Sequence, residues 1–198
     1  MKKVEAKTDI EKIEVNVEKL NANPKKEINF FDDEYRFLSN MYPCKVVVDG
    51  IEYQTSEAVF HAGKFKEKKY KKMLTNLKTK PENGWKDLGK KAKKLGQKSG
   101  ITKQHNLPFD SEAWDNGEGQ KTMLKAVRAK FKDPELAKKL LKTGNATLIE
   151  GTFWNDGTWG VALRKIKDKD GNIIGYKGSG KNQLGKILMK VREELNNE

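Results

Sequence analysis

The chain of 198 residues has a single cysteine, two histidines and no long apolar run. Cys44 alone cannot form an intrachain disulfide, and it excludes a zinc site built from several cysteines. With only His61 and His105 available, a transition-metal site held by the protein is not favoured, and no cofactor is expected. No segment approaches the roughly 18 apolar residues of a membrane span, and no signal-peptide core is present. We therefore expect a soluble, cytoplasmic protein.

Arginine is also scarce, because only Arg36, Arg128, Arg164 and Arg192 stand among the 41 basic residues. The net charge of +13 favours polyanionic partners such as nucleic acid or a phosphorylated substrate. Surfaces dedicated to nucleic acid usually rely on arginine for bidentate contacts with phosphate and guanine. The lysine excess equally suits ordinary solvated helix faces, and both interpretations stay open. Familiar hydrolase motifs such as G-x-S-x-G are absent, so any catalysis falls to carboxylates and lysines.

Apolar periodicity persists in several segments although only 35% of the residues are hydrophobic. The length suits one domain with a real core, and a monomer is the default. Residues 1–27 form an N-terminal extension, either disordered or one edge strand, given the alternation of Ile13, Val15 and Val17. Residues 28–198 are expected to form one domain that carries the functional site. Helices outnumber strands and the strands come as hairpins, which predicts an α+β fold: a mainly helical single domain with a small hairpin-built β-sheet.

The expected elements follow from turn, cap and periodicity signals. We expect strands at 28–31 and 146–150, hairpins at 45–53 and 161–176, helices at 55–78, 85–94, 120–131, from 134 to before Gly144 and from 183 onward, and loops at 32–40, 96–119 and 151–160.

The segment Thr55–Lys78 is predicted to be one helix that carries the chemistry. Thr55 or Ser56 can cap it, and Glu57 suits the positive end of the helix dipole. From Glu57, His61 is four residues on and Lys64 seven, so the three project from one face. A carboxylate and an amine on an apolar helix make an acid/base or imine-forming pair. An ordinary surface ion pair is the alternative.

Two loops could bind the rest of a substrate. Gly178–Asn182 before the last helix resembles a phosphate cradle, in which small residues expose backbone N–H groups and Lys181 adds charge. Its alternative is a flexible glycine turn capped by Asn182. In the loop 155–160, Asp156 stands near Trp159, a pair that can hold a sugar or stack a base. Its alternative is an Asp-Gly turn with a buried tryptophan.

Taken together, these segments resemble the NADAR family. The matching motifs occur in family order over roughly residues 28–195, and the last is the most specific: Asn29-Phe30-Phe31, Leu38-Ser39-Asn40-Met41, Val48-Asp49-Gly50, Thr55-Ser56-Glu57 with Phe60, Ala62 and Lys64-Phe65, Met123 with Ala126 and Arg128–Phe131, Glu150 with Asn155-Asp156 and Trp159-Gly160, and Gly178, Gly180–Asn182, Leu184-Gly185, Leu188-Met189 and Arg192-Glu193.

The chain departs from the family pattern at several positions. Ala58 replaces the usual histidine, and His61 and Gly63 replace two glutamines. The segment Gly96-Gln97 lacks a common Gly-Arg, which puts one phosphate contact in doubt. Residues 1–27 have no counterpart.

The resemblance implies cleavage of an N-glycosidic bond between a ribose and an exocyclic amine. The implied substrates are ADP-ribose on guanine, including guanine in DNA or RNA, and ribosylamino-pyrimidine phosphates of riboflavin synthesis. By this resemblance Lys64 attacks C1 to form a Schiff base, with Glu57 and Asp156 moving protons. An alternative makes Glu57 the base on water, with an oxocarbenium-like transition state. The other expected substrate-binding residues are Phe31, Arg36, Ser39, Asn40, Phe60, His61, Trp159, Gly160, Gly180, Lys181 and Asn182.

Two other kinds of protein fit the same residues. The first is a catalytically silent module that binds ADP-ribose or a nucleotide. The second is a general basic protein that binds nucleic acid without regard to sequence.

Overall fold

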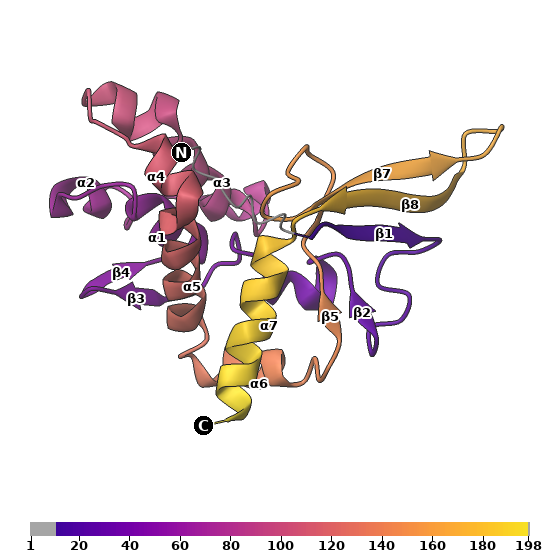
Figure 1. Ribbon diagram of the computed structural model, residues 1–198. Coiled ribbons are helices and arrows are strands. Elements are labelled where there is room, and N and C mark those ends of the chain that lie inside the picture. The colour runs from indigo at the N-terminus through magenta and orange to yellow at the C-terminus, as the bar shows by residue number, and fades with distance from the viewer. Residues whose placement is uncertain (1–10, 198) are drawn as a thin grey trace, which may run out of the picture.

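The main sheet of the computed structural model, which describes residues 11–197, has four strands. Its order is β1 (Ile13–Val17), β8 (Ile173–Gly180), β7 (Val161–Lys167) and β6 (Gly151–Thr152). Strand β8 runs antiparallel to both neighbours, whereas β6 and β7 are parallel. The hairpin β7–β8 extends away from the helices, on the right of Figure 1.

A second hairpin forms where the Asp-Gly turn predicts it. Strands β3 (Val46–Val48) and β4 (Ile51–Tyr53) pair antiparallel, and the backbone φ angles of Asp49 and Gly50 are 51° and 69°. Both central residues of the turn are left-handed, as a type I′ turn requires. The prediction of this hairpin is confirmed.

Two parallel pairings were not expected from hairpins alone. Besides β6 and β7, strand β2 (Glu27–Ile28) pairs parallel with β5 (Thr147–Leu148). The strands predicted at 28–31 and 146–150 are therefore present but only two residues long. Each parallel pair joins segments that are distant in the chain or separated by a loop, so no local turn signal announces it.

Helices make up most of the remaining described structure, with longer helices joined by short turns, some of them 3-10 in character. The predicted α+β class is confirmed. In chain order the helical segments are η1 (Asp33–Leu38), α1 (Ser56–Ala62), α2 (Lys68–Lys72), η2 (Pro81–Asn83), α3 (Asp87–Gly96), η3 (Lys98–Thr102), α4 (Ser111–Ala113), η4 (Trp114–Glu118), α5 (Gly119–Lys130), α6 (Pro134–Leu141) and α7 (Gln183–Asn196).

The expectation of one helix from Thr55 to Lys78 is wrong. Helix α1 ends at Ala62, and the chain leaves it at Gly63, where a Cβ atom would collide with the side chain of Thr122 on α5. The chain then turns so that Phe65 enters the core, at 5% exposure. Helix α2 buries none of its own residues. Gly63 therefore permits α5 to pack closely against the end of α1.

Three predicted loops also differ from the structure. The segment 32–40 contains the turn η1, which buries Phe37 and Leu38, and 96–119 contains η3, α4 and η4. Gly178 and Gly180 lie inside β8 instead of a cradle before α7. A Cβ atom at Gly178 would collide with the carbonyl oxygen of Ala162, and one at Gly180 with that of Gly160, both on the adjacent segment. These glycines permit close strand pairing.

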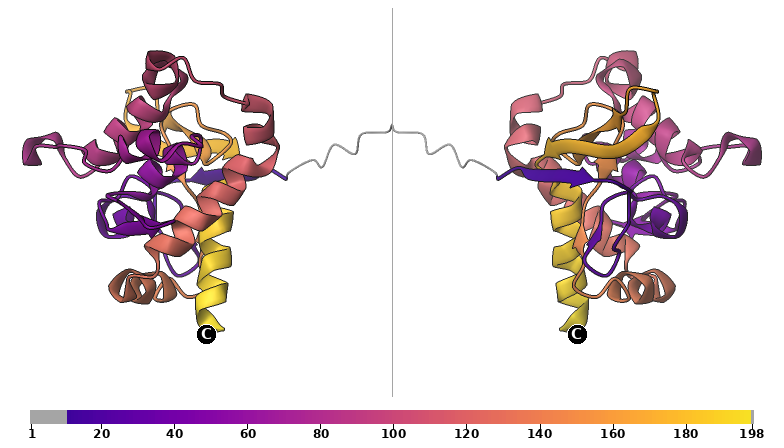
Figure 2. Two further views of the ribbon diagram at one scale, coloured as in Figure 1. Left: turned by 90° about the vertical axis from the view of Figure 1, so that its left-hand side faces the viewer. Right: turned by 90° about the vertical axis from the view of Figure 1, so that its right-hand side faces the viewer.

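The buried side chains form three clusters. The largest lies between α5, α6 and α7, and it includes Phe60 and Leu184. A second lies around the β3–β4 hairpin, α1 and α3, and a small third lies beneath β1 and β7. Figure 2 shows α5 and α7 crossing at the centre of the molecule. Helix α1 therefore stands between the two larger clusters, which fixes its position.

Part of the N-terminal extension joins the sheet. Ile13–Val17 pairs with β8 as the edge strand β1, and Val15 is buried. The side chain of Asn21 accepts hydrogen bonds from the backbone N–H groups of Asn29 and Phe30, at 2.8 and 3.0 Å. Residues 1–10 lie outside the described part of the chain.

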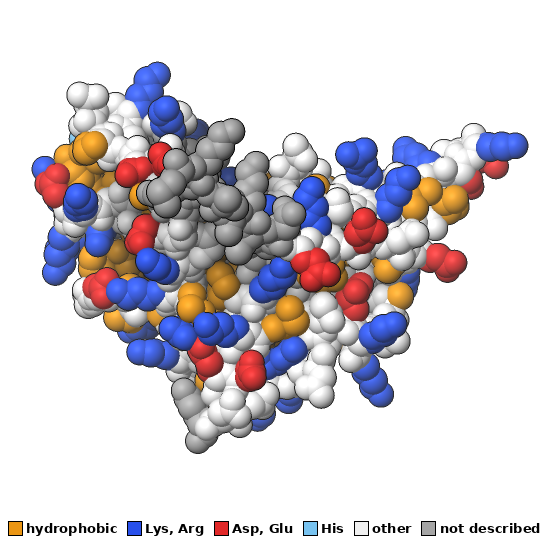
Figure 3. Space-filling model, in the orientation of Figure 1, with side chains coloured by type: hydrophobic (Ala, Val, Ile, Leu, Met, Phe, Trp, Pro, Cys, Tyr) orange, Lys and Arg blue, Asp and Glu red, His pale blue; other side chains and the backbone are white. Residues whose placement is uncertain are grey.

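No helix within residues 11–197 is both long enough and apolar enough to cross a membrane. On the face shown in Figure 3, lysine and arginine side chains are scattered over all the elements, with acidic side chains between them. The positive charge is therefore spread over this face instead of gathered in one patch.

Candidate active site

Helix α1 is held firmly at its first turn. The Thr55 hydroxyl accepts a hydrogen bond from the N–H of Ala58 at 3.1 Å, as an N-cap should. The N–H of Glu57 donates to the carbonyl oxygen of Asn40 at 3.1 Å, which ties α1 to the segment after η1. The start of the helix and the Ser39–Met41 segment therefore form one wall.

Glu57, His61 and Lys64 form a continuous hydrogen-bonded chain. His61 Nε2 lies 3.1 Å from Glu57 Oε1, and Lys64 Nζ lies 3.0 Å from His61 Nδ1. With the imidazole proton on Nε2, His61 donates to the carboxylate and accepts from the amine. Glu57 is 9% exposed and His61 4%, so the surface ion pair considered from the sequence is wrong. The predicted common face of the three residues is confirmed, although Lys64 lies just beyond the end of the helix.

The amine of Lys64 is enclosed by aromatic rings. Its Nζ lies 5.6 Å from the ring centroids of Phe60, Phe109 and Trp114 and donates to the carbonyl oxygen of Gly96 at 2.9 Å. Burial lowers the pKa of Lys64, against the opposite pull of Glu57 and Asp115, and Lys93 lowers it further. Lys64 therefore loses its proton more readily than a surface lysine does.

Helix α3 reaches this group because Gly96 has no side chain. A Cβ atom at Gly96 would overlap the imidazole of His61. The close approach brings the Gly96 carbonyl oxygen to Lys64, and it also places Lys93 at the site. The sequence pattern in this helix, a run of lysines, does not distinguish Lys93 from its neighbours.

These residues surround a cavity of about 270 Å³. Of the predicted site residues, the structure brings eight together around it: Ser39, Asn40, Glu57, Phe60, His61, Lys64, Asp156 and Trp159. The sequence reasoning missed seven further lining residues: Met41, Lys93, Trp114, Met123, Glu150, Trp154 and Leu184.

Glu150 is the most informative of the missed residues. Its Oε2 atom is buried without a hydrogen-bond partner. Burial, with the nearby charges of Asp156 and Glu57, raises the pKa of Glu150 to about 8. The carboxyl therefore holds its proton near neutral pH, beside two further carboxylates. The signal available in the sequence was its place in the family motif, in which Glu150 precedes Asn155-Asp156 and Trp159-Gly160.

The aromatic loop of 151–160 contributes both structure and lining. Asp156 Oδ1 accepts hydrogen bonds from the N–H groups of Thr158 and Trp159, at 3.2 and 2.9 Å. The ring of Trp159 packs against Phe60 with centroids 5.1 Å apart. Asp156 thus forms the turn that was weighed as an alternative, and it also lines the cavity.

Asn40 presents an unused acceptor to the cavity. Its Nδ2 donates to the sulfur of Met123 at 3.0 Å, whereas its buried Oδ1 has no partner. The segment is supported from below by Lys130, whose Nζ donates to the carbonyl oxygen of Ser39 at 2.8 Å. An unpaired buried acceptor is costly, and a ligand hydroxyl would satisfy it.

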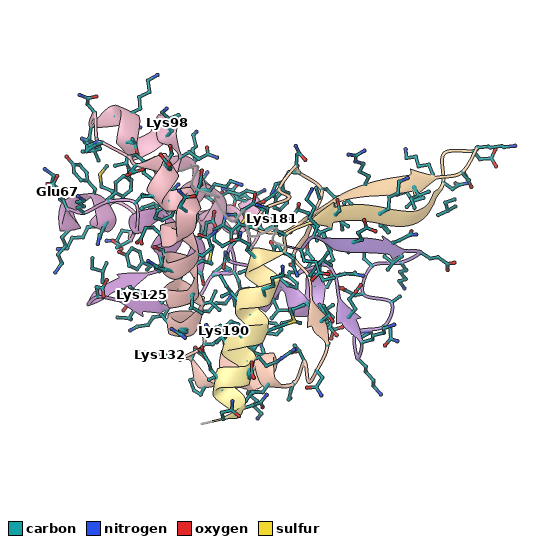
Figure 4. The ribbon with its side chains drawn as sticks, viewed as in Figure 1. Glu67, Lys98, Lys125, Lys132, Lys181 and Lys190 are labelled. Carbon is teal, nitrogen blue, oxygen red and sulfur yellow. The ribbon has the colours of Figure 1, made fainter. Side chains whose placement is uncertain are left out.

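Six predicted binding residues do not line this cavity: Phe31, Arg36, Gly160, Gly180, Lys181 and Asn182. Phe31 is buried in the core, and Arg36 is exposed on η1. Figure 4 shows Lys181 where α7 begins, outside the set of lining residues.

Asn182 has a structural task. Its Oδ1 accepts from the N–H of Glu150 at 3.0 Å, and its Nδ2 donates to the carbonyl oxygen of Leu148 at 2.8 Å. Gly160 packs against the backbone of Glu150, which leaves no room for a Cβ atom. Asn182, from the segment expected to hold phosphates, and Gly160 therefore help to position Glu150. Across residues 11–197, no group of three or more His, Cys, Asp or Glu side chains is arranged to hold a metal ion.

Comparison with known proteins gives a consistent result. The NADAR domain family matches residues 29–196. N-glycosidase YbiA of Escherichia coli K12 is 33% identical over 171 residues, which cover 85% of this chain and 88% of YbiA. The NMR structure of E. coli YbiA superposes with a TM-score of 0.61 at 31% identity, and covers 87% of this chain and 86% of that one. A Vibrio vulnificus protein named riboflavin biosynthesis protein VVA0006 is 30% identical over 165 residues, 83% of this chain but 36% of its own length.

Proposed function

Because the chain belongs to the NADAR domain family, we propose that it is an N-glycosidase that acts on ribose attached to an exocyclic amine. The substrate we favour is ADP-ribose on guanine in nucleic acid. The observation that carries the proposal is the partly buried Lys64 amine, bonded through His61 to Glu57, in a cavity that Glu150 and Asp156 also line.

The first step opens the glycosylamine. The ring oxygen of the ribose takes a proton while the nitrogen lone pair of the base forms a C1–N double bond, which gives an iminium. Glu150, which holds its proton near neutral pH, is the proton donor. A carboxyl with an ordinary pKa would already have lost this proton.

In the second step the neutral amine of Lys64 attacks C1. Its excess proton passes through His61 toward Glu57, along contacts of 3.0 and 3.1 Å. Glu57 passes this proton to the exocyclic nitrogen and becomes a carboxylate again, the C1–N bond to the base breaks, and the base leaves as a neutral amine. C1 then remains joined to Lys64 as a Schiff base.

Hydrolysis completes the reaction. Asp156 and Glu57, now acting as bases, orient and deprotonate a water molecule that adds to C1. The proton taken from water passes to the Lys64 nitrogen, the bond from C1 to Lys64 breaks and regenerates the amine, the remaining hydroxyl proton returns to Glu150, and the free aldehyde closes to ribose. One water is consumed for each base released.

The polar wall from Ser39 to Asn40 suits the sugar and its phosphates. The unpaired Oδ1 of Asn40 accepts from a ribose hydroxyl. Lys93 provides the positive charge for a phosphate, in place of the Gly178–Asn182 segment. Trp154 and Trp159 cover the faces of the sugar.

The mechanism is tested by trapping. Borohydride added during turnover reduces a Schiff base to a stable secondary amine, so mass spectrometry should find the ribosyl adduct on Lys64. Lys64→Ala should give neither adduct nor product, and Lys94→Ala is the matched control, because it removes an exposed lysine of α3 outside the cavity and should still be trapped. Active enzyme without an adduct at Lys64 would instead favour Glu57 acting on water, with Lys64 as an electrostatic helper.

A second substrate is suggested by one observation, that the Vibrio relative is named a riboflavin biosynthesis protein. A ribosylamino-pyrimidine phosphate contains the same bond, and the same residues would cleave it. The two are separated by parallel assays on ADP-ribosylated guanine in DNA and on the free pyrimidine compound. The higher kcat/KM identifies the substrate.

Two non-enzymatic interpretations have their own signatures. A silent module would bind ADP-ribose tightly, release no base from either substrate, and be unaffected by Glu57→Gln. A general nucleic-acid-binding protein would bind plain DNA with strong salt dependence that survives loss of Lys64. The scattered charge of Figure 3 does not favour the latter.

A further inference from the structure

A second cavity of about 470 Å³ adjoins the catalytic one. The two share Lys64 and Trp114 as lining residues, so the nucleophile stands between them. We call the second cavity the aromatic chamber, after the four rings that line it: Phe65, Tyr70, Phe109 and Trp114.

The rings of both cavities form one continuous wall. Centroids of Trp159 and Phe60 lie 5.1 Å apart, those of Phe60 and Trp114 5.1 Å, and those of Trp114 and Phe109 6.0 Å. Tyr70, Phe109 and Trp114 are only half-buried, so their faces remain open to a ligand. Half-buried rings around a hollow are the usual environment for a stacked planar group.

The catalytic cavity is too small to hold the whole substrate. At about 270 Å³ it is smaller than the roughly 300–1,000 Å³ typical of pockets that hold a whole drug-sized ligand. A ribose and its phosphates would fill most of it. Because Lys64 lines both cavities, C1 bonded to its amine lies at their boundary, and the base carried by C1 can extend from there into the aromatic chamber.

Charge decides which end of the substrate enters the chamber. Apart from Lys64, its charged lining residues are Lys66 and three carboxylates, Glu67, Asp110 and Glu118. Figure 4 shows Glu67 at the outer edge, beside α2. Glu67 and Glu118 also pair with Lys69 and Lys121, both at 2.9 Å. Their remaining oxygen lone pairs, with those of Asp110, can accept from the N–H groups at the edge of an uncharged base, whereas a phosphate has no N–H group to offer them. Lys93, which lines the catalytic cavity, carries a positive charge that attracts a phosphate.

We propose that the aromatic chamber binds the leaving base, an uncharged planar ring with N–H donors, stacked against the wall that Phe109 and Trp114 form, while ribose and phosphates stay in the catalytic cavity. The proposal rests on the proposed N-glycosidase function for the direction of the substrate. It assigns Phe109 and the chamber carboxylates Glu67, Asp110 and Glu118 as determinants of base specificity, separate from the groups that break the bond.

Binding of the two separate products tests this without turnover. Guanosine and ADP-ribose are titrated into the protein, and the indole N–H signals of the tryptophans are followed by NMR. Guanosine should shift the Trp114 signal, and Phe109→Ala should weaken its binding about 5- to 150-fold, the equivalent of roughly 1–3 kcal/mol per stacked base. ADP-ribose binding should be unchanged.

Two variants control for folding and for ring chemistry. Phe109→Tyr keeps a stacking ring and should bind guanosine as the wild type does. Phe153→Ala removes an exposed ring, 45% accessible and outside both cavities, and should change neither affinity.

The proposal is overturned if guanosine does not bind, if its affinity is independent of Phe109, or if Phe109→Ala weakens ADP-ribose instead, which would place adenine in the chamber. Failure of the proposed function looks different: neither substrate is cleaved while guanosine still binds through Phe109. If turnover is normal but the guanosine affinity does not depend on Phe109, only the proposed role of the aromatic chamber is refuted, and the N-glycosidase function stands.

Discussion

Replacing Glu150 by glutamine should make the protein more stable, by an amount that grows with pH. Burial and the charges of Asp156 and Glu57 raise the pKa of Glu150 from 4.5 to about 8. Between these values the folded protein keeps a proton that the unfolded chain has lost. The stability of the wild type therefore falls as pH rises through this window, and is lowest above pH 8.

The magnitude follows from the shift. At about 1.4 kcal/mol per pKa unit, the change corresponds to roughly 3–5 kcal/mol between the two ends of the window. Glutamine keeps the shape of the protonated carboxyl and does not titrate, so the variant escapes this loss. Its advantage over the wild type should be near its minimum below pH 4.5, increase most steeply through pH 5–7 and level off above pH 8.

The measurement is urea unfolding of both proteins at pH 5 to 9. Lys130, whose pKa burial lowers to about 8, titrates in both proteins, so its contribution largely cancels in the difference. Glu112→Gln, at an exposed position, controls for the substitution itself. A difference in stability that does not change with pH would refute the protonated state of Glu150 and with it the proposed acid.

The same substitution should reduce catalysis. Loss of a general acid typically lowers kcat by about 10²–10⁴-fold, and KM should change much less. The wild-type rate should fall above pH 8 as Glu150 loses its proton, and this alkaline limb should be absent from the residual activity of Glu150→Gln. An unchanged limb in the variant would assign it to another group.

The remaining predictions concern the relay and its supports. His61→Ala should lower kcat about 10- to 150-fold, the equivalent of one charge-assisted hydrogen bond, whereas His61→Gln should keep most activity because an amide can accept from Lys64 and donate to Glu57; equal loss in both would mean that a proton carrier is required. Asn182→Ala should lower the free energy of unfolding by about 2–5 kcal/mol in thermal or urea unfolding, because two buried backbone groups lose their partner, and unchanged stability would contradict its structural task. Lys130→Met should remove a gain in wild-type stability between pH 8 and 10, because burial lowers the pKa of Lys130 from 10.5 to about 8 and its proton leaves the folded state first; parallel stability curves would contradict this.

Local signals in the sequence predicted most elements correctly. The Asp49-Gly50 turn accepts left-handed backbone, and Asp133 accepts hydrogen bonds from the N–H groups of Glu135 and Leu136 at the start of α6. The helical spacing of Glu57, His61 and Lys64 was enough to place them together. These features depend on residues within one or two turns of each other, so the local sequence is sufficient for them.

Tertiary contacts decided the rest. Residue 63 is glycine because Thr122 on α5 leaves no room for a side chain there, and the glycines of β8 permit strand pairing because the backbone of Gly160 and Ala162 lies against them. The apolar periodicity of each segment does not predict either packing contact.

The sequence by itself determined the family, the α+β class and the trio on α1. Only the tertiary structure revealed that Glu150 faces that trio, that Asn182 holds Glu150 in place, and that an aromatic chamber opens behind Lys64. The physical reason is that desolvation and enclosure belong to no single segment. The pKa of Glu150 is raised by burial and by carboxylates distant in the chain, and the walls of both cavities come from helices and loops that meet only on folding.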